Sequence, residues 1–235
     1  MSATNTTKWI GIGLLGLPLY GVLTFWSALN PQPDPNTDYE AWSRYVTTDF
    51  YLLKHLFGSI LGLILSIFGV VALGAYLARS RAGRMGLVAM VITVFGSALL
   101  LTVGGVSAFS APEQGQMHLQ GIEGYREMPP ILAQTAMIAT FGVSSLLLFV
   151  GNLLLSVAVW RSGTLPRWAG ALLAAAAVFM YPLGLLITAL VTSSTTPTVL
   201  VGAVLIVISG GWIAWSVMRR STTGTVAIKA QPRVQ

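Results

Sequence analysis

A few side chains that can do chemistry lie within long apolar stretches of this sequence. His55 lies about one turn inside the second stretch, and helical periodicity places it on one face with Ser59. Gln134 enters the fourth stretch at a matching depth, and the hydroxyl groups of Thr102 and Thr188 occupy the same halves of their own stretches. Together these groups predict a small polar cavity that binds a ligand. In the alternative interpretation they hydrogen-bond one another or a few waters and serve packing alone.

A second group of polar side chains lies between the third and fourth apolar stretches. It contains His118, Glu113 and Glu123, whose nitrogen and oxygen atoms are donors that a metal ion uses. No zinc-protease or EF-hand spacing accompanies them, so solvated side chains are the alternative. The chain contains no cysteine, which excludes disulfides, thiolate metal sites and cysteine nucleophiles. We therefore expect no cofactor.

The elements that must position these groups are membrane helices. The chain of 235 residues is 54% hydrophobic and only 9% charged, whereas roughly a quarter of the residues in a soluble domain are charged. The sequence predicts an all-α bundle over residues 1–218, followed by a basic tail over 219–235. Six stretches reach the length of about 20 residues that a spanning helix needs. They are residues 9–29, 52–78, 85–109, 131–160, 168–191 and 199–218.

Charged residues segregate once the six stretches are removed. One side holds all 7 acids, whereas the other holds no acid and all the Lys and Arg residues except Arg44, Lys54 and Arg126. The positive-inside rule then predicts a multi-pass protein of the cell (inner) membrane with both termini in the cytoplasm. The net charge of +6 therefore reflects topology first and attraction to anionic lipid headgroups second. Nucleic acid is not expected as a partner.

The polar segment between the first two stretches starts with alternating prolines and then changes character. Thr37 and Glu40 fit a capping box, in which Thr37 is the N-cap. Apolar and aromatic residues follow at helical spacing: Tyr39, Trp42, Tyr45 and Val46. We predict a short amphipathic helix that either lies on the outer leaflet or forms an aromatic plug over the bundle. Residues 110–130 are expected to fold beside it as a structured outer cap.

Several function classes lack the residues that they need. No carboxylate lies within an apolar stretch, so classical proton coupling is not expected. His55 is the single histidine within a stretch, which excludes a two-haem b-type cytochrome. No P-loop or dinucleotide-binding fingerprint is present. Asn152, in the fourth stretch, is expected to donate an interhelical hydrogen bond.

The turn between the fourth and fifth stretches carries one local resemblance. Residues 161–173 read RSGTLPRWAGALL, with Trp160 before them and Tyr181 after them. This segment resembles the RSGxLPRxxGxLL hairpin of bacterial multi-pass membrane proteins in the DUF4386-like group. Because that group is itself uncharacterised, the resemblance implies a bacterial membrane protein and implies no catalytic residue.

Three functions from different classes fit these observations. The first is a non-enzymatic membrane subunit or interaction protein, which contacts the lipid bilayer and other subunits or a second copy of itself. The second is a small-solute binding or transport component that uses the cavity around His55 and Gln134. The third is a metal-dependent or single-cofactor redox enzyme that uses His55 and His118. An enzyme is therefore the least favoured of the three.

Overall fold

A computed structural model describes residues 3–122, 131–190 and 197–229 of the chain. Over these ranges the chain is helical and contains no strand. Six helical segments are long and apolar enough to span a membrane, which confirms the predicted all-α architecture. They are Thr6–Ala28, Asp49–Leu77, Gly83–Leu119, Thr135–Arg161, Arg167–Ile187 and Pro197–Arg220.

Several spans are assembled from more than one helical element. The elements are α1 (Ala3–Leu14), α2 (Gly16–Ala28), α3 (Tyr39–Val46), α4 (Asp49–Leu53), the π-helix η1 (Lys54–Leu61), α5 (Gly62–Leu77), α6 (Gly83–Leu119), α7 (Ile131–Arg161), α8 (Arg167–Met180), α9 (Pro182–Leu190) and α10 (Pro197–Lys229). The first and fifth spans are divided near Pro18 and Pro182. Proline has no N–H to donate to the carbonyl four residues earlier, so the helix breaks there.

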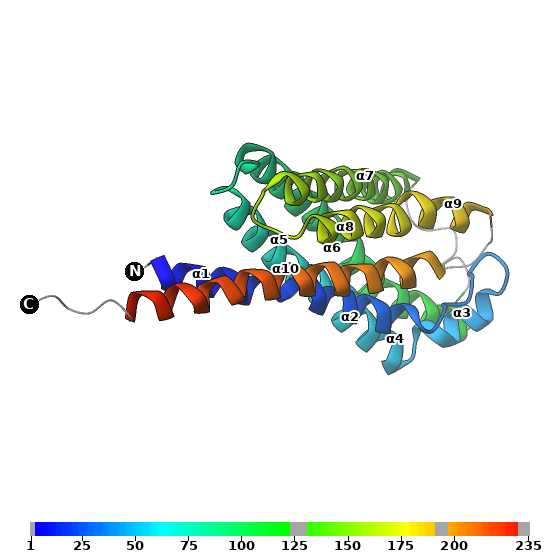
Figure 1. Ribbon diagram of the computed structural model, residues 1–235. Coiled ribbons are helices and arrows are strands. Elements are labelled where there is room, and N and C mark those ends of the chain that lie inside the picture. Colours follow the sequence, from blue (N-terminus) through cyan, green and yellow to red (C-terminus); the bar gives the residue numbers. More distant parts are fainter. Residues whose placement is uncertain (1–2, 123–130, 191–196, 230–235) are drawn as a thin grey trace, which may run out of the picture.

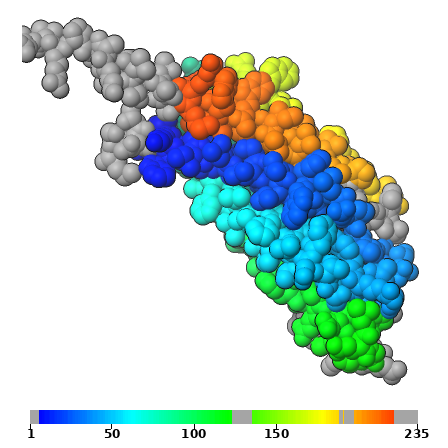
Figure 2. Space-filling view, turned by 90° about the horizontal axis from the view of Figure 1, so that it is seen from below, coloured from blue at the N-terminus to red at the C-terminus, as the bar shows by residue number. Residues whose placement is uncertain are grey.

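The six spans form a closed ring in which each span packs against two neighbours (Figure 1). Around the ring the order is α1 with α2, then η1 with α5, then α6, α7, α8 and α10, which returns to α2. Figure 2 shows four of these spans side by side on one face, in the order α10, α2, α5 and α6. Successive spans are thus neighbours, as short antiparallel connections favour.

The two ends of the bundle carry different elements. The start of α1, the end of α10 and the α5–α6 and α7–α8 turns lie together at one end, which we call the basic end (Figure 1). Helices α3 and α9 lie at the opposite end, which we call the α3 end. The beginning and the end of the described chain therefore share an end, as an even number of spans requires.

Small residues bring the helices into close contact. An added Cβ at Gly62 would lie 3.4 Å from the Tyr20 ring, and one at Gly69 would lie 2.8 Å from the Leu17 backbone nitrogen. The small residues Gly62 and Gly69 of the second span therefore face α2. In lipid such contacts replace the hydrophobic force that drives packing in water.

Helix α3 is present, but its cap differs from the prediction. The carboxylate of Asp38 accepts the first backbone hydrogen bond, from the N–H of Ala41 at 2.9 Å. The Thr37 hydroxyl instead donates to the Asp34 carbonyl at 3.2 Å. The capping box was wrong because Asp34 organises the preceding turn, which leaves Asp38 as the residue with non-helical backbone angles.

The α3 helix packs its aromatic face against the end of α6. Trp42 is 6% exposed and Val46 is fully buried. They pack against the end of α6, which continues to Leu119 and has Pro112 inside it. Residues 110–119, the first part of the predicted outer cap, thus continue α6 as a helix and lie beside α3. The rest of that predicted cap, residues 123–130, lies outside the described ranges.

Candidate functional site

A cavity of about 240 Å³ lies in the α3-end half of the bundle, between the first three spans. Its walls come from α2, η1, α5 and α6. They are formed by Tyr20, Thr24, Ser27, His55, Gly58, Ser59, Leu63, Leu100, Val103, Gly104 and Ser107. The walls thus combine apolar side chains with a few hydroxyl groups and one imidazole, as is typical of a small-molecule site.

The imidazole of His55 has a defined tautomer at this site. Its Nδ1 lies 3.0 Å from the Tyr51 carbonyl oxygen. A carbonyl can only accept, so Nδ1 carries the proton of the neutral ring and Nε2 carries a lone pair. Nε2 lies 3.4 Å from the Ser107 hydroxyl. The cavity wall therefore presents a hydrogen-bond acceptor beside a hydroxyl group.

Tyr51 supports this histidine from behind. Its side chain is fully buried, and its ring lies 4.0 Å from the His55 ring. The Tyr51 hydroxyl donates to the Ser107 carbonyl at 2.9 Å and lies 3.1 Å from the Ser107 hydroxyl. This contact joins the second span to the third at the depth of the cavity. Sequence reasoning missed both residues, although Ser107 lies as close to the end of its apolar stretch as His55 does to its own.

The backbone around His55 is a π-helix instead of an α-helix. Short π-helical segments within α-helices are frequent at functional sites. Gly58 of η1 is pressed against the Ser27 side chain of α2. At the first residue of η1, the buried Lys54 ammonium donates to the Asn30 carbonyl and to the Tyr45 hydroxyl. The histidine is thus held between a close helix contact and an anchored lysine.

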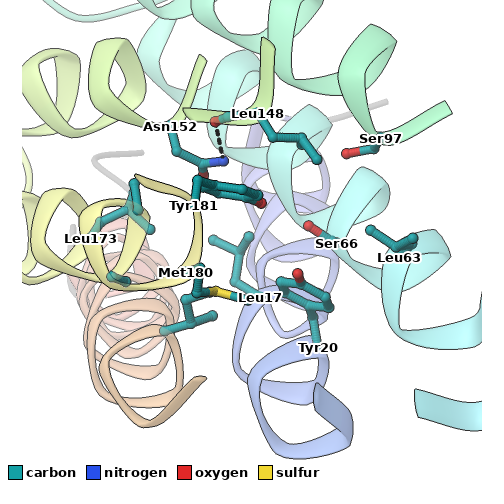
Figure 3. Close-up of a pocket in the computed structure, with 13 residues that line it drawn as sticks. Leu17, Tyr20, Leu63, Ser66, Ser97, Leu148, Asn152, Leu173, Met180 and Tyr181 are labelled. Atoms are coloured by element: carbon teal, nitrogen blue, oxygen red, sulfur yellow. Dashed lines mark hydrogen bonds between the residues drawn. The ribbon is translucent and has the colours of Figure 1, made fainter. Parts of the chain in front are cut away.

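A smaller chamber lies at the centre of the ring, and all six spans contribute to its lining (Figure 3). Its volume of about 20 Å³ is enough for about one water molecule. Tyr20 and Leu63 line both this chamber and the larger cavity. Tyr20 interacts with Tyr181 from across the ring. The two hollows therefore share a wall at Tyr20.

Polar groups in the central chamber come from several helices (Figure 3). The Ser97 hydroxyl is fully buried and has no hydrogen-bond partner among the described residues. Asn152 donates to the Leu148 carbonyl at 2.7 Å, within its own helix. The predicted interhelical bond of Asn152 was therefore wrong, because the carbonyl one turn earlier is the nearer acceptor.

Toward the basic end the bundle closes. The cluster of buried side chains there includes Leu14, Leu73 and Ile213, none of which has any exposed surface. These side chains come from three different spans. A route from the α3 end therefore stops at the central chamber in this conformation.

Only some of the residues that were predicted to line the cavity lie together in the structure. His55 and Ser59 line the 240 Å³ cavity. Thr102 is exposed on the outside of α6, and its hydroxyl donates to the carbonyl three residues earlier at 2.7 Å. The side chains of Gln134 and Thr188 lie outside the described part of the structure. Helical spacing correctly related His55 to Ser59 within one helix, but it did not give the rotation of the third span.

His118 lies in a contact that fastens α3 to the end of α6. Its Nε2 lies 3.2 Å from the Glu40 carboxylate, and its ring meets Tyr39 edge-on at 4.7 Å. Glu113 is exposed, and Glu123 lies outside the described ranges. Among the residues that the structure describes, no three His, Cys, Asp or Glu side chains are grouped to hold a metal ion. His118 has a structural partner instead.

Glu40, which takes part in this contact, also has a shifted pKa. The pKa of Glu40 is lowered, chiefly because its carboxylate accepts a hydrogen bond from the Arg44 guanidinium at 2.8 Å. His118 contributes in the same direction. The carboxylate form therefore favours the arrangement of α3 on α6.

Comparisons of this chain with protein-family models, curated proteins and solved structures found no match. The resemblance of residues 161–173 to the DUF4386-like hairpin thus stays a prediction. In the structure this segment forms the turn between α7 and α8, where Ser162 accepts hydrogen bonds from the N–H groups of Thr164 and Leu165. A functional assignment therefore depends on the geometry of the cavities.

Proposed function

We propose that this integral membrane protein binds a small, uncharged solute in the cavity beside His55. The observation that carries the proposal is a 240 Å³ cavity whose polar wall holds an imidazole with its Nε2 lone pair toward Ser107. An acceptor in this position selects a solute with a hydrogen-bond donor, such as a hydroxyl or amide group. With a neutral imidazole, no lining residue is charged, and a charged solute would lose its hydration without gaining a counter-ion.

The size of the cavity limits the solute further. At about 30 Å³ for each water molecule, the cavity has room for roughly eight waters. Its apolar wall, which includes Leu63, Leu100 and Val103, suits a compact solute with an apolar body and one or two polar groups. Sugars and nucleotides need more polar partners than this wall offers.

We place the protein in a bacterial cell membrane with the basic end in the cytoplasm, on the basis of its charge segregation. The 240 Å³ cavity then lies in the outer half of the membrane. A solute would enter from that side and reach Tyr20, beyond which lies the central chamber. This arrangement supports the binding step of transport, and passage would require the packed basic-end half to open.

A ligand-dependent stability measurement tests the proposal. The purified protein in mild detergent is heated with and without a panel of small neutral alcohols and amides, and its unfolding midpoint is recorded. A solute that binds the native state at 100 times its Kd stabilises it by about 2.7 kcal/mol. We expect His55→Leu to abolish the stabilisation and Thr102→Val, on the exposed face of α6, to preserve it. An equal shift in wild type and His55→Leu would exclude this site.

A second candidate function is that of a subunit in a membrane assembly. The α3-end half of α7 is exposed on successive residues, 135–139 and 141–143. A spanning helix that is packed on one side buries every third or fourth residue, so this part of α7 exposes more of its surface than packing on one side would leave. Lipid alone or another protein can cover it.

Purification in mild detergent followed by mass spectrometry tests the second candidate. We expect a co-purifying protein, or a second copy of this chain, that is lost when Ile138 or Phe141 is replaced by Gln. A variant at Val91, which is exposed on α6 in the basic-end half, provides the matched control. If the protein purifies as a monomer without any associated protein at every detergent concentration, the subunit function is excluded.

A further inference from the structure

A third cavity, separate from the one beside His55, lies at the basic end. Its volume is about 200 Å³. Three parts of the chain meet around it: α1, the end of α5 with its following turn, and the α7–α8 turn. The lining residues are Thr7, Ile10, Tyr76, Arg79, Ser80 and Thr164.

The polar groups of this cavity are suited to an anion. Arg79 contributes a guanidinium group, and neither ion pair among the described residues includes it. The segments at the basic end contain no Asp or Glu that could neutralise it. The Thr164 hydroxyl is buried and has no hydrogen-bond partner among the described residues. One unneutralised cation and one unused hydroxyl thus share a cavity.

The two turns that carry these groups are held in fixed conformations. Ser162 accepts hydrogen bonds from the N–H groups of Thr164 and Leu165 at 3.2 and 3.1 Å. Gly163, between them, has a φ of +69°, which favours glycine. In the other turn, Ser80 accepts from the N–H of Ala82 at 3.1 Å. The cavity therefore does not have to be ordered by its ligand, which lowers the cost of binding.

The two turns are also neighbours in space. A Cβ added to Gly163 would lie 4.0 Å from the Arg81 Cδ atom. Arg81 is exposed, as are Arg79, Arg84 at the start of α6 and Arg161 at the end of α7. Their positive charges attract anions to the mouth of the cavity, although they are screened within about 10 Å at ordinary salt concentrations.

We propose that the cavity beside Arg79 binds a phosphate group. The guanidinium group donates paired hydrogen bonds to phosphate oxygens, and the Thr164 hydroxyl, which is buried without a ligand, donates one more after its side chain rotates toward the cavity. A phospholipid headgroup and free inorganic phosphate share this chemistry. The position at the ends of membrane spans, where arginine side chains reach the headgroup level, makes a lipid the accessible source.

Binding of defined phosphate probes to the full-length protein in uncharged detergent tests the proposal. The probes are inorganic phosphate and dihexanoyl phosphatidylglycerol, and dihexanoylglycerol serves as the phosphate-free control. Calorimetry gives the Kd of each. We expect Arg79→Gln to weaken binding at least tenfold, since a charge-assisted hydrogen bond contributes about 1.5 to 3 kcal/mol. Thr164→Val, which keeps every charge, should weaken it about threefold to tenfold.

The controls separate the specific cavity from a generally basic surface. Arg84→Gln removes the same charge from the same end outside the cavity and should change the Kd less than twofold. Binding of the phospholipid alone identifies a headgroup site, and binding of both probes identifies a site for the phosphate group itself. The proposal is wrong if neither probe binds saturably, or if Arg84→Gln weakens binding as much as Arg79→Gln. Because valine has nearly the same shape as threonine, an unchanged Kd in Thr164→Val would also exclude this cavity as the phosphate-binding site.

Discussion

The two halves of the bundle are built from similarly apolar helices, but the helices pack differently in each half. In the basic-end half, buried side chains from all six spans form one continuous cluster, and glycines such as Gly16 and Gly151 touch neighbouring backbones. In the α3-end half, Gly105 and Gly142 have nothing within 4 Å of an added Cβ, and the 240 Å³ cavity lies nearby. Close packing fills the centre of the ring in the basic-end half, whereas in the α3-end half a cavity remains between the first three spans.

The difference also concerns backbone geometry and polar contacts. The α3-end half contains the π-helix η1 and hydrogen bonds between spans, such as the bond from Tyr51 to the Ser107 carbonyl. The basic-end half has regular helices, and its hydroxyl groups mostly bond within their own helix, as Thr93 does to the Ala89 carbonyl at 2.8 Å. Specific polar contacts therefore organise one half, and close apolar packing organises the other.

The largest expected effect concerns the sidedness of the two ends. The chain has no cysteine, so single cysteines can be introduced without background labelling. We expect Asn36→Cys to react with an impermeant maleimide in intact cells and Ser80→Cys to react only after permeabilisation. The opposite pattern would place the His55 cavity on the cytoplasmic side and the phosphate cavity outside.

The second prediction compares glycine substitutions in the two halves. Gly16→Ala should destabilise the protein by about 1 to 3 kcal/mol, because its Cβ would overlap the Leu65 carbonyl oxygen and lie 3.0 Å from the Gly69 nitrogen. Gly105→Ala, where nothing lies within 4 Å, should be neutral or stabilising by up to about 1 kcal/mol. Unfolding in a denaturing detergent, followed by circular dichroism, measures both. Equal effects would contradict the contrast in packing.

The third prediction concerns the contact behind His55. Tyr51→Phe removes the hydroxyl that donates to the Ser107 carbonyl at 2.9 Å, and this should cost about 1 kcal/mol. The same variant should weaken solute binding, since the His55 wall is less firmly joined to α6. Thr140→Val, which removes a hydroxyl bonded within α7, is the control. A stable Tyr51→Phe protein with unchanged binding would show that the contact does not position the site.

The smallest expected effect is the response of α3 to acid. The carboxyl group of Glu40 has a folded-state pKa below its ordinary value of 4.5, chiefly because of its hydrogen bond with Arg44. Its contribution to stability is therefore complete above pH 4.5 and is lost as the pH falls through the lower, folded-state pKa. Hydrogen exchange over residues 39–46 should speed up in that range beyond its intrinsic pH dependence. In Glu40→Gln this additional change should disappear.

Particular residues show how far sequence reasoning reached. His55 and Ser59 are four residues apart on one helix, so their shared face followed from the helical period. Thr102 was assigned to the same cavity by depth alone, and it proved to lie on the opposite face of α6. Tyr51 was not selected, because a tyrosine at a membrane boundary usually reflects the interface. Here it is fully buried behind His55.

The sequence by itself determined the helical class, the six spans and the segregation of charge between the two ends. These are properties of consecutive residues, because the length of an apolar stretch and the charges that flank it need no knowledge of neighbouring helices. Only the tertiary structure decided which polar groups meet. The rotation of each helix about its axis, the π-turn around His55 and the order of spans in the ring depend on contacts between distant segments. Those contacts set the Tyr51, His55 and Ser107 group and the cavity beside Arg79.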